Sequence, residues 1–202
     1  IFPKRMISNL KLIGSGEEST ILDADSTSSV IVLDKISNVT LESLTIRNGH
    51  ALGEYDTSGE AGDEGDNWAG GGIFSNYSSY ITLKDVTIRD NSADAFAGIH
   101  FWVGINFYLT NVTIRDNTAE ISGGAGSIAS ASNLYGWNSD ELLTNVVITG
   151  NRATNDDSHL GGILFFYCDP ILQNVTISEN TAATRSGGMA IWGSNPILVN
   201  SI

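Results

Sequence analysis

Cysteine is almost absent from this chain of 202 residues: Cys168 is the only one, so no disulfide can form within the chain. A lone cysteine is more often a small buried apolar side chain than a nucleophile, and no catalytic triad accompanies this one. Basic residues are also scarce, with 10 Lys and Arg against 23 Asp and Glu and a formal net charge of −13. This acidic balance argues against nucleic acids and anionic membrane surfaces as partners.

Long apolar runs and helical periodicity are missing as well. No window approaches the apolar stretch that a transmembrane helix needs, so we expect no insertion of this segment into a membrane. No sustained stripe with a period of 3.6 residues occurs, which predicts little or no helix. The chain starts at Ile1 without the basic and apolar regions of a signal peptide, and it ends inside a repeat. We therefore expect an excerpt of a longer chain.

What the sequence does contain is a degenerate repeat. A segment of the form Val-Thr-Ile-Arg-Asp-Asn-x-Ala, with substitutions at several positions, recurs at irregular steps of 26 to 42 residues. Its copies are 44–51, 86–93, 112–119, 146–153 and 175–182. A second motif, glycine followed by an apolar segment, precedes each later copy. These glycine motifs begin at Gly70, Gly98, Gly126, Gly161 and Gly187.

Each copy of the repeat predicts a β-strand, with a turn at asparagine. Apolar and polar residues alternate within each copy, which predicts Val and Ile inward and Thr outward, and the glycine pairs let the chain bend sharply into the next strand. Two sets of asparagines recur at turn positions: Asn91, Asn117, Asn151 and Asn180, and Asn111, Asn145, Asn174 and Asn200. Because stacked coils about 4.8 Å apart bring equivalent side chains together, these sets predict hydrogen-bonded ladders rather than catalytic groups.

The combination of Gly-Gly-Ile with Asn-Val-Thr-Ile-x-x-Asn-x-Ala resembles the pectin-lyase-like superfamily of right-handed parallel β-helices, over most of residues 10–202. Within it, the pattern is similar to bacterial surface repeat proteins such as the chlamydial polymorphic outer-membrane proteins. The resemblance implies an all-β, right-handed, single-stranded parallel β-helix, a solenoid of about seven coils. Short strands at this spacing could also form a sandwich, but the unvarying order of motifs favours a coil. We expect residues 1–202 to form one such domain, with an acidic loop inserted at 52–69.

This fold carries lyases, hydrolases, adhesins and phage tailspikes, so it does not decide function. The resemblance implies recognisable sites for the enzymes of the superfamily. Polygalacturonase-like members carry Gly-His-Gly and Arg-Ile-Lys motifs, and neither occurs here. Pectate-lyase-like members carry a calcium-binding carboxylate cluster together with an arginine or lysine base.

The inserted loop contains the only dense acidic segment, with carboxylates at Glu54, Asp56, Glu60, Asp63, Glu64 and Asp66. Calcium requires several hard oxygen ligands held together, and we take Asp56, Asp63, Glu64 and Asp66 as its candidate ligands. The alternative is a solvated acidic loop, because the spacing matches no EF-hand or nonapeptide pattern.

Arg47, Arg89 and Arg115 occupy one outward position of three successive repeats. Stacked like charges on adjacent strands destabilise each other, and Asp90 and Asp116 follow two of the arginines directly. One interpretation is a surface column with local ion pairs, each of little energetic value. The other is a cationic stripe for carboxylated or sulfated sugars, which suits the planar guanidinium group.

Aromatic side chains follow the glycine motif in three repeats, as Trp102, Phe166 and Trp192, and Trp137 lies in the insertion before a later copy. Outward aromatic rings stack against sugar rings, so these four residues are candidates for glycan contact. The alternation leaves the direction of the first three open, and the other interpretation is that they fill the core or cover loops. His100 lies beside Trp102 and could belong to the same groove.

We therefore interpret the chain as a non-catalytic, secreted or cell-surface β-helix module, an adhesin or stalk that contacts a polysaccharide or another surface protein. The first alternative is a carbohydrate-active enzyme, a polysaccharide lyase or glycoside hydrolase acting on an acidic polysaccharide. Its groove would lie beside Arg89, Arg115, His100 and Trp102. The second alternative is an inert spacer that presents another domain. Calcium is the one cofactor that the sequence suggests, and the oligomeric state stays open.

Overall fold

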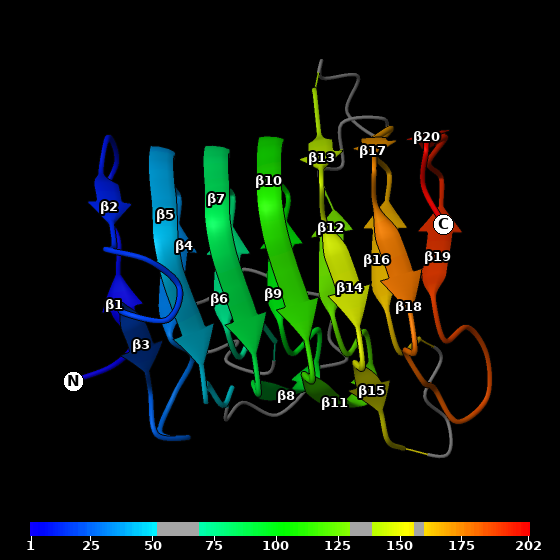
Figure 1. Ribbon diagram of the computed structural model, residues 1–202, viewed down its shortest axis with the longest axis horizontal. Coiled ribbons are helices and arrows are strands. Elements are labelled where there is room, and N and C mark those ends of the chain that lie inside the picture. Colours follow the sequence, from blue (N-terminus) through cyan, green and yellow to red (C-terminus); the bar gives the residue numbers. More distant parts are fainter. Residues whose placement is uncertain (52–68, 130–138, 156–159) are drawn as a thin grey trace.

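The computed structural model describes residues 1–51, 69–129, 139–155 and 160–202, and every regular element within them is a β-strand. The strands pair in parallel, and successive coils of the chain add strands to the same sheets (Figure 1). The expected all-β parallel solenoid without helices is therefore confirmed for this part of the chain. The acidic insertion expected at 52–69 lies outside the described residues, apart from Ala69.

One side of each coil belongs to a seven-stranded sheet whose strands follow one another in chain order. They are β1 (Lys4–Arg5), β4 (Ile31–Asp34), β6 (Ile73–Asn76), β9 (Ile99–Trp102), β12 (Gly126–Ala129), β16 (Ile163–Phe166) and β19 (Met189–Trp192). Seven strands side by side confirm the expected number of about seven coils. Six steps of about 4.8 Å make this stack roughly 29 Å tall.

A ten-stranded sheet lies in front of the seven-stranded sheet in Figure 1. Its strands are β2 (Lys11–Ile13), β3 (Ile21–Asp23), β5 (Ser37–Arg47), β7 (Ser79–Arg89), β10 (Ile105–Arg115), β13 (Leu142–Thr144), β14 (Val147–Thr149), β17 (Ile171–Gln173), β18 (Thr176–Ser178) and β20 (Ile197–Val199). A three-stranded sheet closes the lower edge of the middle coils with β8 (Ser92–Ala95), β11 (Thr118–Ser122) and β15 (Arg152–Ala153).

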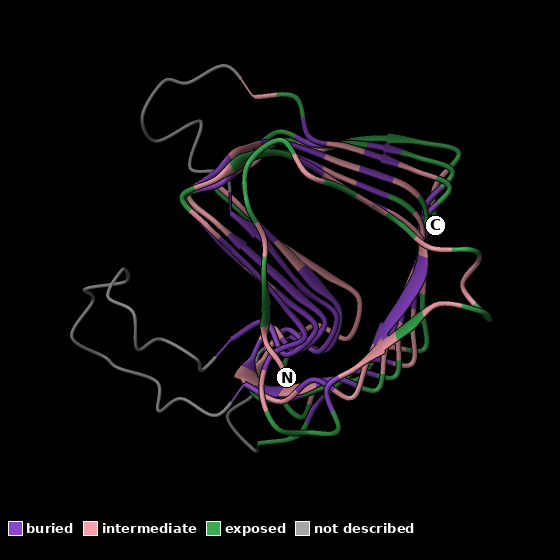
Figure 2. Ribbon diagram, turned by 90° about the vertical axis from the view of Figure 1, so that its left-hand side faces the viewer, coloured by how far each residue is buried: buried purple, intermediate pink, exposed green. Residues whose placement is uncertain are grey.

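The apolar positions of the repeat fill the interior between the sheets. Ile46, Ile88 and Ile114 stack in register on β5, β7 and β10, and all three are fully buried. Each buried side chain of this size contributes roughly 1.5–3 kcal/mol. Phe101 and Phe107, from the two large sheets, meet with ring centroids 4.5 Å apart. Viewed along the stack, the coils superpose and their buried segments line the inside (Figure 2).

Six coils of the ten-stranded sheet bend at the same repeat position, at a residue with a left-handed backbone. These residues are Ser43, Asp85, Asn111, Asn145, Asn174 and Asn200, with φ between 48° and 57°. Polar residues with short side chains tolerate this conformation best, which explains the preference for asparagine. The strands β5, β7 and β10 continue through the bend, whereas in later coils it separates β13 from β14 and β17 from β18. The predicted asparagine turn is therefore confirmed.

The other predicted set forms a buried ladder at the end of the ten-stranded sheet. Asn117 donates from Nδ2 to Asn151 Oδ1 over 2.9 Å and to the carbonyl of Ile88 over 3.1 Å. Its own Oδ1 accepts from the backbone N–H and the Nδ2 of Asn91. The same pattern continues through Asn151 to Asn180. Asn91, Asn117 and Asn151 therefore each join three coils, whereas Asn180 bonds to the preceding coil.

A second ladder runs along the exposed surface at the bend. Asn111 donates to Asp85 over 2.8 Å, Asn145 donates to Asn111 over 3.1 Å, and Asn174 donates to Asn145 over 3.1 Å. Because water can replace these partners, this ladder contributes less to stability than the buried one.

The glycines of these motifs have two physical roles. Gly70, with φ of 69°, has the left-handed backbone that favours glycine, as the expected bend requires. Gly72, Gly98 and Gly162 do not have the left-handed φ that favours glycine. A Cβ on Gly98 would lie 2.3 Å from the carbonyl oxygen of Ala125, and one on Gly162 would lie 1.7 Å from that of Gly188. Glycine is therefore required here because the backbone of the next coil approaches too closely for any side chain.

We predict that Asn117→Ala lowers the free energy of unfolding by roughly 3 kcal/mol, because it leaves several buried donors and acceptors without partners. Urea unfolding followed by circular dichroism would measure the loss. Asn195→Ala is the matched control, since this exposed asparagine makes only one long side-chain hydrogen bond, of 3.4 Å, to Asp169. Equal losses in the two variants would contradict a special role for the buried ladder.

Candidate functional site

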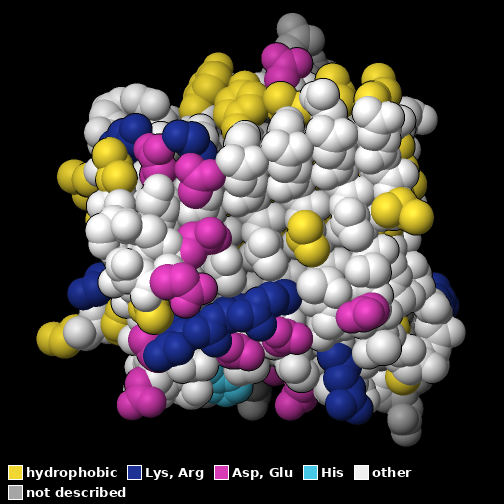
Figure 3. Space-filling model, viewed as in Figure 1, with side chains coloured by type: hydrophobic (Ala, Val, Ile, Leu, Met, Phe, Trp, Pro, Cys, Tyr) yellow, Lys and Arg dark blue, Asp and Glu magenta, His cyan; other side chains and the backbone are white. Residues whose placement is uncertain are grey.

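The arginine column lies on the outer face of the ten-stranded sheet. Arg47, Arg89 and Arg115 are direct neighbours in register at the ends of β5, β7 and β10. Figure 3 shows the cationic row with acidic side chains along it. The sequence therefore placed these three residues correctly relative to one another.

Each arginine of this column has its own carboxylate. Arg47 Nε lies 2.8 Å from Asp23 Oδ2, and Arg89 and Arg115 pair with Asp90 and Asp116. Burial opposes ionisation of Asp23, but hydrogen bonds from the Asp25 N–H, Asn48 and Arg47 hold its pKa below the ordinary value. The column is thus a row of ion pairs, and its cationic groups are already compensated.

A second charged group on this sheet was missed by the sequence reasoning. Glu42 stands in register with Lys84 and contacts Lys11 and Lys84 at 2.8 Å and 2.7 Å. Hydrogen bonds from the two lysines lower the pKa of Glu42 to about 2. The three residues come from three different coils, so only a correct alignment of the strands would have brought them together.

The candidate aromatic residues lie on the outer face of the seven-stranded sheet. Ile99 and Phe101 of β9 are buried, so alternation turns Trp102 outward. Phe166 and Trp192 are register partners on β16 and β19, with centroids 5.7 Å apart. Trp102 and Phe166 have centroids 6.0 Å apart and an interplanar angle of 24°. The structure therefore joins Trp102, Phe166 and Trp192 in one outward group, which we call the aromatic row.

His100 supports this row from one side. It is only 3% exposed, its ring is stacked on that of Phe96 at 4.9 Å, and it lies 5.8 Å from the ring of Trp102. Its Nδ1 lies 2.7 Å from Ser127 Oγ, within hydrogen-bonding distance. Burial lowers the pKa of His100 to about 3, so the ring is neutral at physiological pH. A neutral, enclosed imidazole fixes its neighbours rather than facing a substrate.

The arginine column and the aromatic row belong to different sheets. β7 and β10 lie in front in Figure 1, whereas β9 and β16 lie behind them. The structure therefore does not bring Arg89 and Arg115 together with His100 and Trp102 in the single groove that the enzyme hypothesis required.

Several predicted residues lie outside the described part of the chain: the calcium candidates Asp56, Asp63, Glu64 and Asp66, and the aromatic candidate Trp137. Among the residues that are described, no group of three or more His, Cys, Asp or Glu side chains is arranged to hold a metal ion. Cys168 is buried, and its Sγ donates to the Ile128 carbonyl over 3.3 Å, which confirms the small core side chain expected from the sequence.

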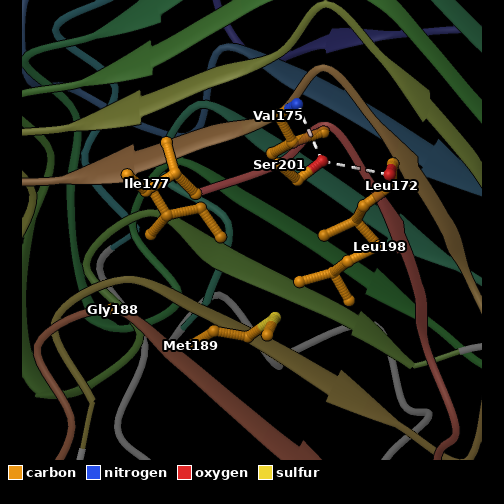
Figure 4. A pocket seen from close by; sticks show the side chains of 8 residues that line it. Leu172, Val175, Ile177, Gly188, Met189, Leu198 and Ser201 are labelled. Atoms are coloured by element: carbon orange, nitrogen blue, oxygen red, sulfur yellow. Dashed lines mark hydrogen bonds between the residues drawn. The ribbon is translucent and has the colours of Figure 1, made fainter.

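A pocket of about 210 Å³ opens at the last coil, where the core column ends. Its lining consists of Leu172, Val175, Ile177, Gly188, Met189, Leu198, Ser201 and Ile202. Ser201 Oγ is bonded within the wall, accepting from the Val175 N–H and donating to the Leu172 carbonyl (Figure 4). With no titratable side chain in its lining, this pocket offers no acid or base for catalysis.

Comparisons with known proteins point to the same fold. The family profile described as "Right handed beta helix region" matches residues 19–202. Comparison with curated proteins and with solved structures gave no match. In the described residues, no helix is long and apolar enough to cross a membrane.

We predict that His100 makes stability depend on pH. Its pKa is about 3 in the folded chain against 6.5 as the ordinary value, so the unfolded chain binds an extra proton between these limits. The stabilisation is present above pH 6.5 and is lost as the pH falls toward 3. Between pH 7 and pH 5 the free energy of unfolding should fall by about 2 kcal/mol more in the wild type than in His100→Gln. Urea titrations at both pH values measure this, and parallel changes would refute it.

We also predict that removing a carboxylate beside the arginine column destabilises the fold more than removing an arginine from it. Asp90→Asn leaves Arg89 between two other arginines without its carboxylate, whereas Arg89→Gln removes one of the stacked charges. At low salt, Asp90→Asn should therefore be the more destabilising change, by roughly 0.5 kcal/mol. Thermal unfolding in low and high salt tests this, because screening should reduce the difference. A difference of the same size at both salt concentrations would contradict the electrostatic explanation.

Proposed function

Because the chain belongs to the right-handed β-helix family, we propose that it is a non-catalytic module of a secreted or cell-surface protein, acting as a stalk or adhesin. The observation that carries this proposal is the pair of asparagine ladders, which join the coils along both the interior and the surface. A solenoid whose coils are joined in this way is a stiff rod with long, regular faces, suited to hold or present a contact surface.

The charge distribution supports an extracellular contact role. A net charge of −13 keeps the chain soluble and disfavours nucleic acids and anionic membranes as partners. The partner would be a polysaccharide or another surface protein, which the regular outer faces of the two large sheets are long enough to contact.

The alternative enzyme acting on an acidic polysaccharide has less support. Such an enzyme needs a free cation to bind uronate groups and a base within reach of the substrate. Arg89 and Arg115 are paired with aspartates, and His100 is enclosed on another sheet. The inert spacer remains the third candidate, and it differs from an adhesin in binding no ligand.

We expect the purified chain to release neither unsaturated uronates nor reducing ends from polygalacturonate or alginate, with and without added calcium. The measurements are ultraviolet absorbance of the unsaturated product and a reducing-sugar assay. Wild type and the double variant Arg89→Ala/Arg115→Ala should give the same baseline. Turnover by the wild type that the double variant lacks would overturn the proposal in favour of a lyase or hydrolase.

A further inference from the structure

One outward column of side chains on the seven-stranded sheet changes from polar to mainly aromatic residues along the stack. In register from β4 to β19 it contains Asp34, Asn76, Trp102, Ala129, Phe166 and Trp192. Asp34 Oδ1 accepts a hydrogen bond from Asn76 Nδ2 over 3.2 Å. The aromatic row therefore continues directly from a polar carboxylate–amide pair.

The small side chain of Ala129 makes the row continuous. Trp102 and Phe166 are two coils apart, which corresponds to about 9.6 Å of strand spacing. Their ring centroids are nevertheless only 6.0 Å apart, because the two rings lean toward each other above Ala129. The row thus extends over four coils, about 14 Å along the stack. Trp192 is the most open of its members, with 64% of its surface exposed.

Neighbouring groups hold the rings in place. Tyr167 lies edge-on to Phe166 at 4.6 Å. A Cβ on Gly193 would lie 2.6 Å from the ring of Tyr167, so this ring rests directly on the glycine backbone. His100 lies beside Trp102, as described above. Rings that are already fixed lose little conformational freedom when a ligand binds.

Within the part of the chain that the structure describes, the strands of this face carry almost no charge on their outward side. The outward residues of β6, β9, β12, β16 and β19 are Phe74, Asn76, His100, Trp102, Ser127, Ala129, Leu164, Phe166, Ala190 and Trp192. They include no Lys, Arg, Asp or Glu, and the nearest charges among the described residues of the column are Asp34 and the exposed Lys35 that follows it. A uronate or sulfated polymer would find no row of cations here, and Asp34 would repel it.

We propose that this face binds an uncharged polysaccharide, with sugar rings stacked on Trp102, Phe166 and Trp192. Aromatic faces match the C–H faces of pyranose rings, and a ligand site combines such apolar surface with a few polar groups that fix orientation. Asp34, which is partly exposed and held by the buried Asn76, provides such a polar group for sugar hydroxyls. The inference rests on the proposed non-catalytic function and gives that module its class of ligand.

Affinity electrophoresis and isothermal titration with the intact chain test the proposal. The probes are neutral polymers, namely xyloglucan, galactomannan and a mixed-linkage β-glucan, and the acidic polymers polygalacturonate and alginate. We expect at least one neutral polymer to bind and neither acidic polymer to do so. Trp192→Ala should weaken binding roughly tenfold. Tyr80→Ala is the matched control, because this tyrosine is 52% exposed but lies on the ten-stranded sheet. It should bind like the wild type.

A second variant separates loss of contact from loss of folding. Ala129→Leu places a larger side chain between Trp102 and Phe166, so it should weaken binding while circular dichroism and the melting temperature confirm a folded chain. Binding that both Trp192→Ala and Ala129→Leu leave unchanged would overturn the proposal.

Three further outcomes would also overturn it. The first is that no neutral polymer binds. The second is that only acidic polymers bind and that this binding is lost in Arg89→Ala/Arg115→Ala. The third is that Trp192→Ala changes the molar mass measured by light scattering. The last outcome would identify the face as a protein contact. None of these results affects the proposed non-catalytic function, which only cleavage of a polymer would refute.

Discussion

The whole molecule depends on one constraint: each coil repeats the backbone path of the previous coil, so that parallel strands stay in register. Under this constraint, the nearest neighbours of a side chain are its counterparts 26 to 42 residues away. A residue type can therefore recur at one position of successive coils only if identical side chains can lie in contact without repulsion. Isoleucine does so by packing, and asparagine does so because its amide is both donor and acceptor. Arginine does not, and each arginine of the column accordingly has an aspartate beside it.

This constraint also explains how much the sequence could predict. The inward Ile positions, both asparagine ladders and the arginine column follow once the copies of the repeat are aligned, because aligned residues must be adjacent in space. The all-β parallel fold and the number of coils were predicted for the same reason. The expected glycine bend holds at Gly70, but the requirement for glycine at Gly98 and Gly162 could not be predicted. Their close approach to the next coil depends on inter-coil distances that no single repeat reveals.

Other features depend on the third dimension and could not be predicted. From the sequence alone the direction of Trp102 and Phe166 near the strand end stayed open, and the burial of Phe101 and Phe165 beside them resolved it. The sequence places His100 two residues from Trp102, yet only the packing of Phe96 shows that the imidazole is enclosed. The cluster of Lys11, Glu42 and Lys84 required an alignment of the first coils, where the repeat is weakest. The aromatic row lies on the outer face of the seven-stranded sheet, whereas the arginine column lies on that of the ten-stranded sheet.

The two asparagine ladders also have a direction. Where two asparagines of the buried ladder bond to each other, the amide donates toward the C-terminal coil, from Asn91 through Asn117 and Asn151 to Asn180. In the exposed ladder each amide donates toward the N-terminal coil. The amide dipoles of the two rows therefore point in opposite directions and cancel in part. Within a row, hydrogen bonds of the same polarity strengthen one another. No amide can rotate by half a turn without breaking the bonds on both sides, so the orientation of one asparagine sets that of the whole row.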